Sequence, residues 1–555
     1  MSTSVLKPLN AARFSVSKNN GVQYIDGDND VRVPVCSLLR VDALTADANS
    51  HNWGKLVSFR DPTGEEKHHH ILNSSLMSNG KAVVSELVNK GLDLAGHARA
   101  AGLLIQYIRS TTPATRMTSS TNPGWAGDSY LLTSGESFGK TRLLYSGDFT
   151  EPRHATAGNW KDQVGRYCSG NSRFLLAASA AFAGPVLELV HMVEGGGFHF
   201  RGEAATGKST ALEIACSVFG NPDDVKGSWD ATKGSFEAVA ESHNDQLLVL
   251  DEIGMADQKT VGDVVYLLAN GVSKARMKEQ RRKWRLLSLS SGEISLADQM
   301  AKMNLTPMSG QETRLLDIAI EPVKGKMYRG VRMGAIENVH RFADSRVLAD
   351  HLKAATRTNY GVFTEYIKLL VRRQVQARKT ARRLVDQFVA EATPTRSNGQ
   401  IGRAINRFAV ISAGGELASS FGLTGWKKGE ATEAALKCFG AWYEHYQNYD
   451  PLARSVGTVR EFLAANADRF QELGRDAVLV NKRVGYRKKG VFLILPEVFR
   501  EVICAGLIAD ETAKSLEIAG YLLTSGANRL MYSSRVTGNP TPQRFYAVKD
   551  SIFAA

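Results

Sequence analysis

The sequence has few cysteines and no long apolar run, and each shortage excludes a class of protein. Its five cysteines lie far apart, form no CxxC motif and are odd in number, which excludes a disulfide framework and a cysteine-based zinc finger. No uncharged apolar run reaches the roughly 18–20 residues that span a bilayer, and the first residues contain no apolar core followed by a cleavage site. We therefore expect a cytoplasmic protein without a membrane partner.

The composition is that of a large globular protein. A length of 555 residues corresponds to about three or four domains. Hydrophobic residues make up 43% and charged residues 23%, which excludes a wholly disordered or fibrous chain. Lys and Arg exceed Asp and Glu by 69 to 56, a net charge of +13. This excess points to a polyanionic partner only where the charge clusters.

Four regions differ in their residue patterns. Short strands between turns, with helical patches, predict an α+β domain over residues 1–150. Buried strands alternating with helices predict an α/β core over residues 151–330, and residues 331–450 are expected to be mostly helical. Helices with a β-hairpin over residues 451–555 predict a winged-helix-like domain.

The strongest motif is GEAATGKS at residues 202–209, a full match to the phosphate-binding pattern G-x-x-x-x-G-K-[ST]. A predicted strand precedes it and a predicted helix follows. Its glycines allow backbone amides to surround phosphates at the helix N-terminus. Lys208 would reach the β- and γ-phosphates of ATP, and Ser209 would ligate Mg²⁺. The residues predicted to bind the nucleotide are Gly202, Glu203, Ala204, Ala205, Thr206, Gly207, Lys208, Ser209, Thr210 and Asp251.

A second motif, QLLVLDE at residues 246–252, is an apolar run that ends in two carboxylates. The run is typical of a buried parallel strand, whose carboxyl end is where an α/β sheet carries its chemistry. Asp251 would hold Mg²⁺, and Glu252 would polarise the attacking water. A small-molecule kinase would also have the loop, but the adjacent Glu252 favours an ATPase.

A third strand is predicted at residues 285–291, where RLLSLSS ends in hydroxyl groups. ATPases of the AAA+ kind carry a polar residue at this tip, on a strand between the first two, to sense the γ-phosphate. Ser290 and Ser291 both fit that role, and the pattern does not decide between them. A strand capped by a serine turn is the alternative.

Arg314 lies just before another apolar strand. It would stabilise γ-phosphate charge from a neighbouring subunit, as arginine fingers do. The alternative is an ion pair with Glu312 or Asp317.

Two basic segments are candidates for contact with DNA. Residues 273–285 hold seven cations and one anion, with Trp284 among them. A charge run is usually a solvated face, but this one lies where ring-forming helicases insert a hairpin that follows phosphates. The predicted DNA-binding residues in a ring pore are Lys274, Arg276 and Lys278. The basic turn at residues 482–489 resembles a wing that contacts duplex DNA, with a solvated loop as the alternative.

These motifs occur in an order that resembles the family catalogued as domain of unknown function 927. They are GNWK at 158–161, CSGN at 168–171, GGGFHF at 195–200, NGxxKxR at 270–276, LSSGE at 289–293 and GQExR at 310–314. That family is found in bacterial mobile elements and prophages and includes replication helicases of staphylococcal cassette chromosomes. The resemblance covers about 150–325 closely and 30–150 loosely, and it extends to residues 407–426.

The resemblance implies an AAA+-like, hexameric ring helicase similar to MCM-type motors. It implies ATPase roles for Lys208, Ser209, Asp251 and Glu252, and a second sensor role for Arg407. Ser273 departs from the glycine usual in the family. The combined prediction is an ATP- and Mg²⁺-dependent DNA helicase that replicates a mobile element or prophage. The alternatives are an ATP-gated origin-binding initiator without unwinding activity and a protein-remodelling ATPase of a defence system.

Overall fold

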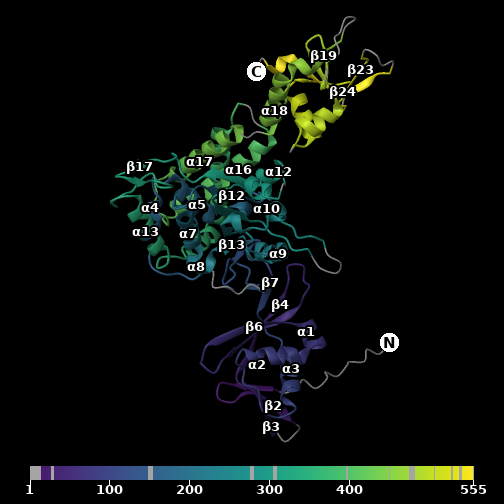
Figure 1. Cartoon of the computed structure of the whole chain (residues 1–555). Coiled ribbons are helices and arrows are strands. Elements are labelled where there is room, and N and C mark those ends of the chain that lie inside the picture. The colour runs from purple at the N-terminus through teal and green to yellow at the C-terminus, as the bar shows by residue number, and fades with distance from the viewer. Residues whose placement is uncertain are drawn as a thin grey trace.

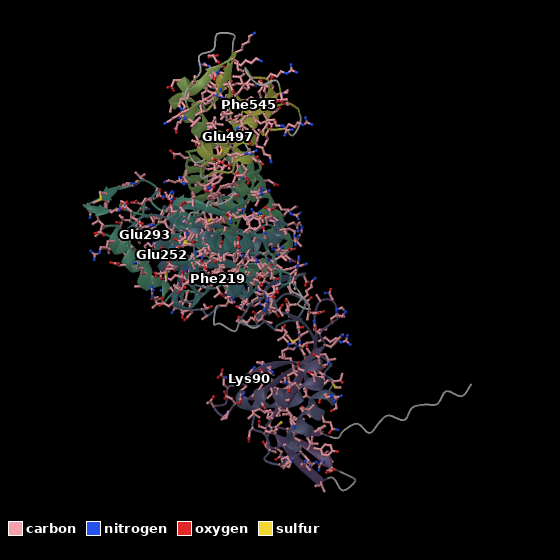
Figure 2. The ribbon with its side chains drawn as sticks, turned by 45° about the vertical axis from the view of Figure 1, so that its right-hand side comes forward. Lys90, Phe219, Glu252, Glu293, Glu497 and Phe545 are labelled. Atoms are coloured by element: carbon pink, nitrogen blue, oxygen red, sulfur yellow. The ribbon has the colours of Figure 1, made fainter. Side chains whose placement is uncertain are left out.

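The computed structural model describes residues 14–26, 31–147, 154–275, 281–303, 305, 309–395, 398–448, 451–473, 480, 482–505, 507–526, 529–536 and 541–553. Figure 1 shows three parts in a row, with the N-terminal part at the bottom, a larger central part, and the C-terminal part at the top. Figure 2, turned by 45°, shows the same order, with Lys90, Phe219 and Phe545 in the three successive parts. Among the described residues, no helix is both long and apolar enough to cross a membrane.

The described residues of the N-terminal part combine strands with the helices α1, α2 and α3. Its sheets have the orders β1-β2-β3 and β11-β7-β4-β5-β6, and the second packs with the apolar faces of α2 and α3 in one core. The Lys55 ammonium donates to the carbonyl oxygens of Arg109 (2.8 Å) and Thr111 (2.6 Å) at the end of α3, where the helix dipole favours a cation. The elements are β1 (Phe14–Ser17), β2 (Gly21–Asp26), β3 (Val31–Cys36), β4 (Leu39–Ala46), β5 (Gly54–Arg60), β6 (Glu66–Leu72), α1 (Asn73–Ser78), α2 (Gly80–Asn89), α3 (Ala100–Ser110), β7 (Arg116–Ser120) and β11 (Leu143–Tyr145).

A small sheet joins the N-terminal part to the central part. It has the order β10-β9-β8, and its Tyr130 and the following Leu132 belong to the central core. The Tyr130 hydroxyl donates to the carbonyl oxygen of Asp245 (2.9 Å), and the Trp125 indole donates to that of Pro185 (2.9 Å). The strands are β8 (Gly124–Ala126), β9 (Ser129–Leu131) and β10 (Ser137–Phe138).

The central part is built around a five-stranded parallel sheet. Its order is β13-β14-β15-β12-β16, so that β15 lies between β12 and β14. Apolar side chains alternate between the two faces because successive residues of a strand point in opposite directions. One face packs with α5, α7 and α16, and the other with α9 and α10. The strands are β12 (Gly196–Arg201), β13 (Gly227–Ser228), β14 (Leu247–Asp251), β15 (Leu287–Gly292) and β16 (Leu315–Ala319).

The helices from α13 to α17 share the core of the central sheet. Phe408 of α16 packs edge-on against Phe198 of β12, with ring centroids 4.9 Å apart. Apolar residues on both sides of the predicted boundary at residue 330 therefore form a single core. The α-helices of this part are α4 (Arg166–Cys168), α5 (Ser172–Ala183), α6 (Val186–Leu189), α7 (Lys208–Phe219), α8 (Pro222–Val225), α9 (Lys233–Ser242), α10 (Val261–Asn270), α11 (Leu296–Ala301), α12 (Ser309–Glu312), α13 (Ser345–Thr356), α14 (Phe363–Arg372), α15 (Gln374–Ala392), α16 (Gly399–Ser420) and α17 (Glu430–Asn448), among the described residues.

The C-terminal part has a mixed sheet of order β19-β20-β21-β24-β22, with β23 also paired to β24. Of the predicted basic turn at 482–489, residues 485–488 form β20, the first strand of the β20–β21 hairpin, which precedes the helices η4 and α19. The strands β22 and β24 follow those helices. The elements are α18 (Pro451–Ala465), β19 (Phe470–Glu472), β20 (Gly485–Lys488), β21 (Val491–Ile494), η4 (Val498–Ile503), α19 (Ala509–Ile518), β22 (Leu522–Leu523), β23 (Tyr532–Ser534) and β24 (Gln543–Lys549).

Together these parts make a multidomain α/β protein with a parallel sheet, as the sequence predicts. All five cysteines are free and buried. In every case burial raises the pKa of the thiol, most clearly for Cys168 and Cys216 inside the central core.

Candidate nucleotide-binding site

The residues 202–207, which we call the 202–207 loop, connect the end of β12 to the start of α7. The Gly202 amide donates to the carbonyl oxygen of Gly292 at the end of β15 (3.2 Å). The Thr206 hydroxyl donates to the Glu203 carbonyl oxygen (2.6 Å), and Gly207 takes a left-handed conformation with φ 95°. The loop therefore lies at the carboxyl end of the sheet and at a helix N-terminus, where anions are favoured.

The side chains of the loop and of the first turn of α7 divide into exposed and buried ones. Glu203, Ala204, Ala205 and Ser209 are exposed, whereas Thr206, Lys208 and Thr210 are buried. The Lys208 ammonium donates to the carbonyl oxygens of Gly202 and Glu203, both at 2.7 Å. Because these acceptors are neutral, they leave the positive charge of Lys208 in place at the loop, next to the N-terminus of α7.

Asp251, at the end of β14, is held on both carboxylate oxygens. The Ser291 hydroxyl donates to Oδ1 (2.5 Å), and the Lys226 ammonium lies 3.0 Å from Oδ2. Lys226 is also 4.0 Å from Glu213 of α7, and the Asp251 contact raises the pKa of this half-buried lysine against the effect of desolvation. Through Lys226, these contacts link the end of β14 to the middle of α7.

Ser290 and Ser291 point to opposite faces of the sheet. Ser290 is fully buried; its hydroxyl accepts a hydrogen bond from the Trp229 indole (2.8 Å) and lies 3.0 Å from Nδ1 of His199. Ser291 lies next to Phe200 in the strand register, on the face covered by α7, and contacts Asp251. Of the two, Ser291 is therefore the serine at the candidate site.

Glu252 follows β14 directly and has a left-handed backbone with φ 56°. A non-glycine residue in this conformation is uncommon, and such strain is found mainly at functional positions. Its amide lies 3.5 Å from the Ser291 hydroxyl. The strands β12 and β14 run parallel with β15 between them, and neighbouring strands are about 4.8 Å apart. Glu252 and the 202–207 loop follow the carboxyl ends of these two strands, so they share one end of the sheet. Figure 2 shows Glu252 and Glu293 close together in the central part.

Arg314 lies at the other end of the sheet, directly before β16. Its carbonyl oxygen accepts the amide of Gly197, near the start of β12 (2.7 Å). The guanidinium donates to the Gly310 carbonyl oxygen (2.8 Å) and to the Asn270 amide oxygen (3.3 Å), and it lies 4.0 Å from the centroid of the Tyr266 ring. These contacts hold the side chain in one orientation. The alternative partner Asp317 instead pairs with Arg201 (2.8 Å).

Arg407, for which the resemblance implies a second sensor role, lies at the amino end of the sheet as well. Its guanidinium packs on the backbone of Gly196 and donates to the Thr313 carbonyl oxygen. Burial lowers the pKa of Arg407 to about 10, and its Nε has no hydrogen-bond partner among the described residues. A pocket here is lined by Val193, Glu194, Gly195, Ala269, Asn270, Thr313, Arg314, Arg403 and Arg407.

The basic segment forms a hairpin base at the same end. Val272 and Lys283 form a bridge, and the Ser273 hydroxyl accepts the amide of Arg282 (3.0 Å). Serine thus fits the place where the family usually has glycine. Lys274 is exposed, whereas Arg276 and Lys278 lie outside the described residues.

Some cations of this basic segment form ion pairs within the chain. Arg282 pairs with Glu241 (2.8 Å), and Arg285 pairs with Asp245 (2.6 Å) and Glu188 (2.5 Å). Trp284 is buried and donates to the Leu268 carbonyl oxygen (3.1 Å). It is therefore part of the core and not an aromatic surface for bases.

Two basic residues near the site belong to no sequence motif. Lys226 contacts Asp251, as described above. Arg332, of the hairpin β17 (Met327–Tyr328) and β18 (Val331–Arg332), contacts Glu203 of the 202–207 loop (2.7 Å). No spacing in the sequence predicts either contact, because both residues reach the site from connecting segments.

The fold and this arrangement define an α/β protein with a phosphate-binding sequence motif at the carboxyl end of a parallel sheet. Residues 14–282 match the family model described as Domain of unknown function (DUF927), which confirms the resemblance predicted from the motifs. The match extends further toward the N-terminus than the close resemblance and ends before residues 289–314. No curated protein matches the chain.

A solved structure described as "SCCmec type IV Cch - active helicase" is similar over the whole length. The TM-score is 0.69 with 18% identity, and the similarity covers 99% of this chain and 100% of that chain. At this identity the likeness establishes a shared fold.

Proposed function

We propose that the chain is an ATP-dependent DNA helicase that works as a hexameric ring and replicates a mobile element or prophage. The observation that carries this proposal is the shared carboxyl end of the 202–207 loop, Asp251 and Glu252, with Arg314 at the opposite end. The solved relative described as an active helicase of a cassette chromosome supports it at the level of the fold.

The groups at the carboxyl end suit Mg-ATP. Backbone amides at the start of α7 and the buried Lys208 would bind the phosphates, and Glu252 would orient the attacking water. Ser209 and Asp251 offer the hard oxygen ligands that Mg²⁺ prefers. When bound, Mg²⁺ would neutralise charge on the phosphates. Ser291 would fix Asp251 and report on the γ-phosphate.

Arg314 cannot serve the nucleotide of its own chain. The strands that separate it from the loop have five or six residues and span about 16–20 Å. We infer that Arg314 reaches the ATP of a neighbouring subunit, in a head-to-tail contact that closes into a ring. Figure 1 agrees with such a contact, since α12, next to Arg314, and β17, next to the loop, lie on opposite sides of the central part.

DNA would contact the basic hairpin, with Lys274, Arg276 and Lys278 following the backbone of one strand. If the C-terminal part is a winged helix, η4 and α19 would be its two adjacent helices. Its wing would then be formed by the strands that follow them, β22 to β24, instead of by the basic segment at 482–489. The helix α19 carries Asp510, Glu511 and Glu517 against a single Lys514. That acidic helix is unsuited to the major groove, so a role as a duplex-reading initiator is disfavoured.

The test is Glu252→Gln with forked DNA. We expect ATP binding to persist while turnover and strand displacement fall by about 10²–10⁴-fold, because the water loses its base. The exposed Glu365→Gln on α14 is the matched control and should behave as wild type. Normal turnover in Glu252→Gln would contradict the assignment. Wild-type ATPase activity without strand displacement would favour the initiator, and turnover without any DNA affinity would favour the protein-remodelling ATPase.

A further inference from the structure

Arg332 is anchored at one side and reaches the 202–207 loop at the other. Its Nε and Nη2 donate to the two carboxylate oxygens of Glu321 (2.8 and 2.6 Å), a bidentate geometry that fixes the guanidinium plane. The Glu321 side chain is only 8% exposed. The remaining Nη1 donates to Oε2 of Glu203 (2.7 Å). The arginine therefore bridges a buried carboxylate and a loop carboxylate.

Glu203 puts a negative charge in a loop that would hold a triphosphate. Its side chain is 64% exposed, and the Arg332 contact lowers the pKa of Glu203. A proton therefore does not neutralise this carboxylate near neutral pH. Without a cation beside it, the Glu203 carboxylate would repel the phosphates of a bound triphosphate.

The segment that follows Arg332 also holds the loop through its main chain. The Ala335 amide donates to the Thr206 carbonyl oxygen (2.8 Å). Gly334 has a left-handed conformation with φ 57°, and a Cβ there would lie 2.4 Å from that oxygen. Only glycine permits this approach. Residues 332–335 thus contact the loop at both Glu203 and Thr206.

We propose that Arg332 is a positioning residue for the 202–207 loop, which neutralises Glu203 so that the loop accepts a nucleoside triphosphate. The inference rests on the proposed nucleotide site. Arg332 itself does not contact the reacting atoms, and its effect on nucleotide affinity passes through Glu203.

The experiment measures the affinity of the full chain for a fluorescent ATP analogue with Mg²⁺. Arg332→Ala should weaken binding about tenfold, and the double variant Arg332→Ala with Glu203→Gln should restore it to within about threefold of wild type. Because the loss is electrostatic, it should shrink as salt rises from low to high concentration. Arg329→Ala, which removes an exposed arginine of the same hairpin, is the control and should bind as wild type.

Glu203→Gln alone leaves the Arg332–Glu321 pair intact and covers the case in which Arg332→Ala folds poorly. It should bind the analogue up to about threefold more tightly, because a repulsive charge is removed. Unchanged affinity in a folded Arg332→Ala, a failed rescue, or clearly weaker binding by Glu203→Gln would each overturn the proposal. Absence of binding by the wild-type chain would instead overturn the nucleotide site itself.

Discussion

The two ends of the central sheet differ in how their charged groups are satisfied. At the carboxyl end, Asp251 has partners on both oxygens within the chain, and Lys208 is satisfied by loop carbonyls. At the amino end, Arg314 is oriented by neutral groups and a ring, and the buried Arg407 keeps an Nε without an acceptor among the described residues.

The amino end thus keeps a buried donor that the described residues do not satisfy. An unpaired buried donor is costly, so the Nε of Arg407 suits an acceptor that comes from outside the chain. The base of the hairpin, where Val272 pairs with Lys283, also lies at the amino end. We infer that the carboxyl end holds the nucleotide and that the amino end meets the neighbouring subunit and DNA.

The largest expected effect comes from mixing two inactive variants. Glu252→Gln and Arg314→Ala should each lose turnover, Arg314→Ala by about 10³-fold, because each removes half of a shared site. In an equal mixture, about a quarter of the subunit contacts join an intact Glu252 to an intact Arg314, so about a quarter of wild-type turnover should return. ATPase rates of the mixed and separate proteins check this.

The matched control for that mixture combines Glu252→Gln with the double variant Glu252→Gln and Arg314→Ala, which has no intact contact and should stay inactive. If the first mixture also stays inactive although the proteins exchange subunits, Arg314 does not act across a contact.

A smaller effect is expected from the two adjacent serines. Ser291→Ala removes the Asp251 contact and should lower turnover about 10–100-fold, with little change in stability. Ser290→Ala leaves the Trp229 indole without its acceptor and should lower the free energy of unfolding by about 1–3 kcal/mol, with turnover within about threefold. ATPase assays and urea titrations followed by tryptophan fluorescence separate the outcomes. The reverse pattern would assign the site to Ser290.

The serine pair illustrates what the sequence alone can predict. The loop, the strand before Asp251 and the strand before Ser291 are local patterns, and the structure confirms them as elements. The choice between Ser290 and Ser291 depends on which face α7 covers, and that is set by packing between distant segments. Strand periodicity alone cannot supply this, because both faces of the sheet are buried.

The same limit applies to the charged groups at the amino end. Residues 273–285 look like a free cationic run, but Arg282 and Arg285 are paired with carboxylates from α9, the turn before β14 and α6. The motif order identifies Arg407, whereas the crossing of α16 over the start of β12 decides where its guanidinium lies. Composition records the charges but not their partners.

The smallest effect is expected in DNA binding and tests whether the amino end meets DNA. Lys274→Ala with Arg276→Ala should lower the slope of log affinity against log salt by about 1.4, because two contacts with single-stranded phosphates are lost, while nucleotide affinity stays unchanged. Titrations of single-stranded DNA at several salt concentrations give the slope. Arg282→Ala is the control; it removes a cation already paired with Glu241, so its slope should stay that of wild type. An unchanged slope in the double variant would move the DNA contact away from this hairpin and leave the amino end to the neighbouring subunit alone.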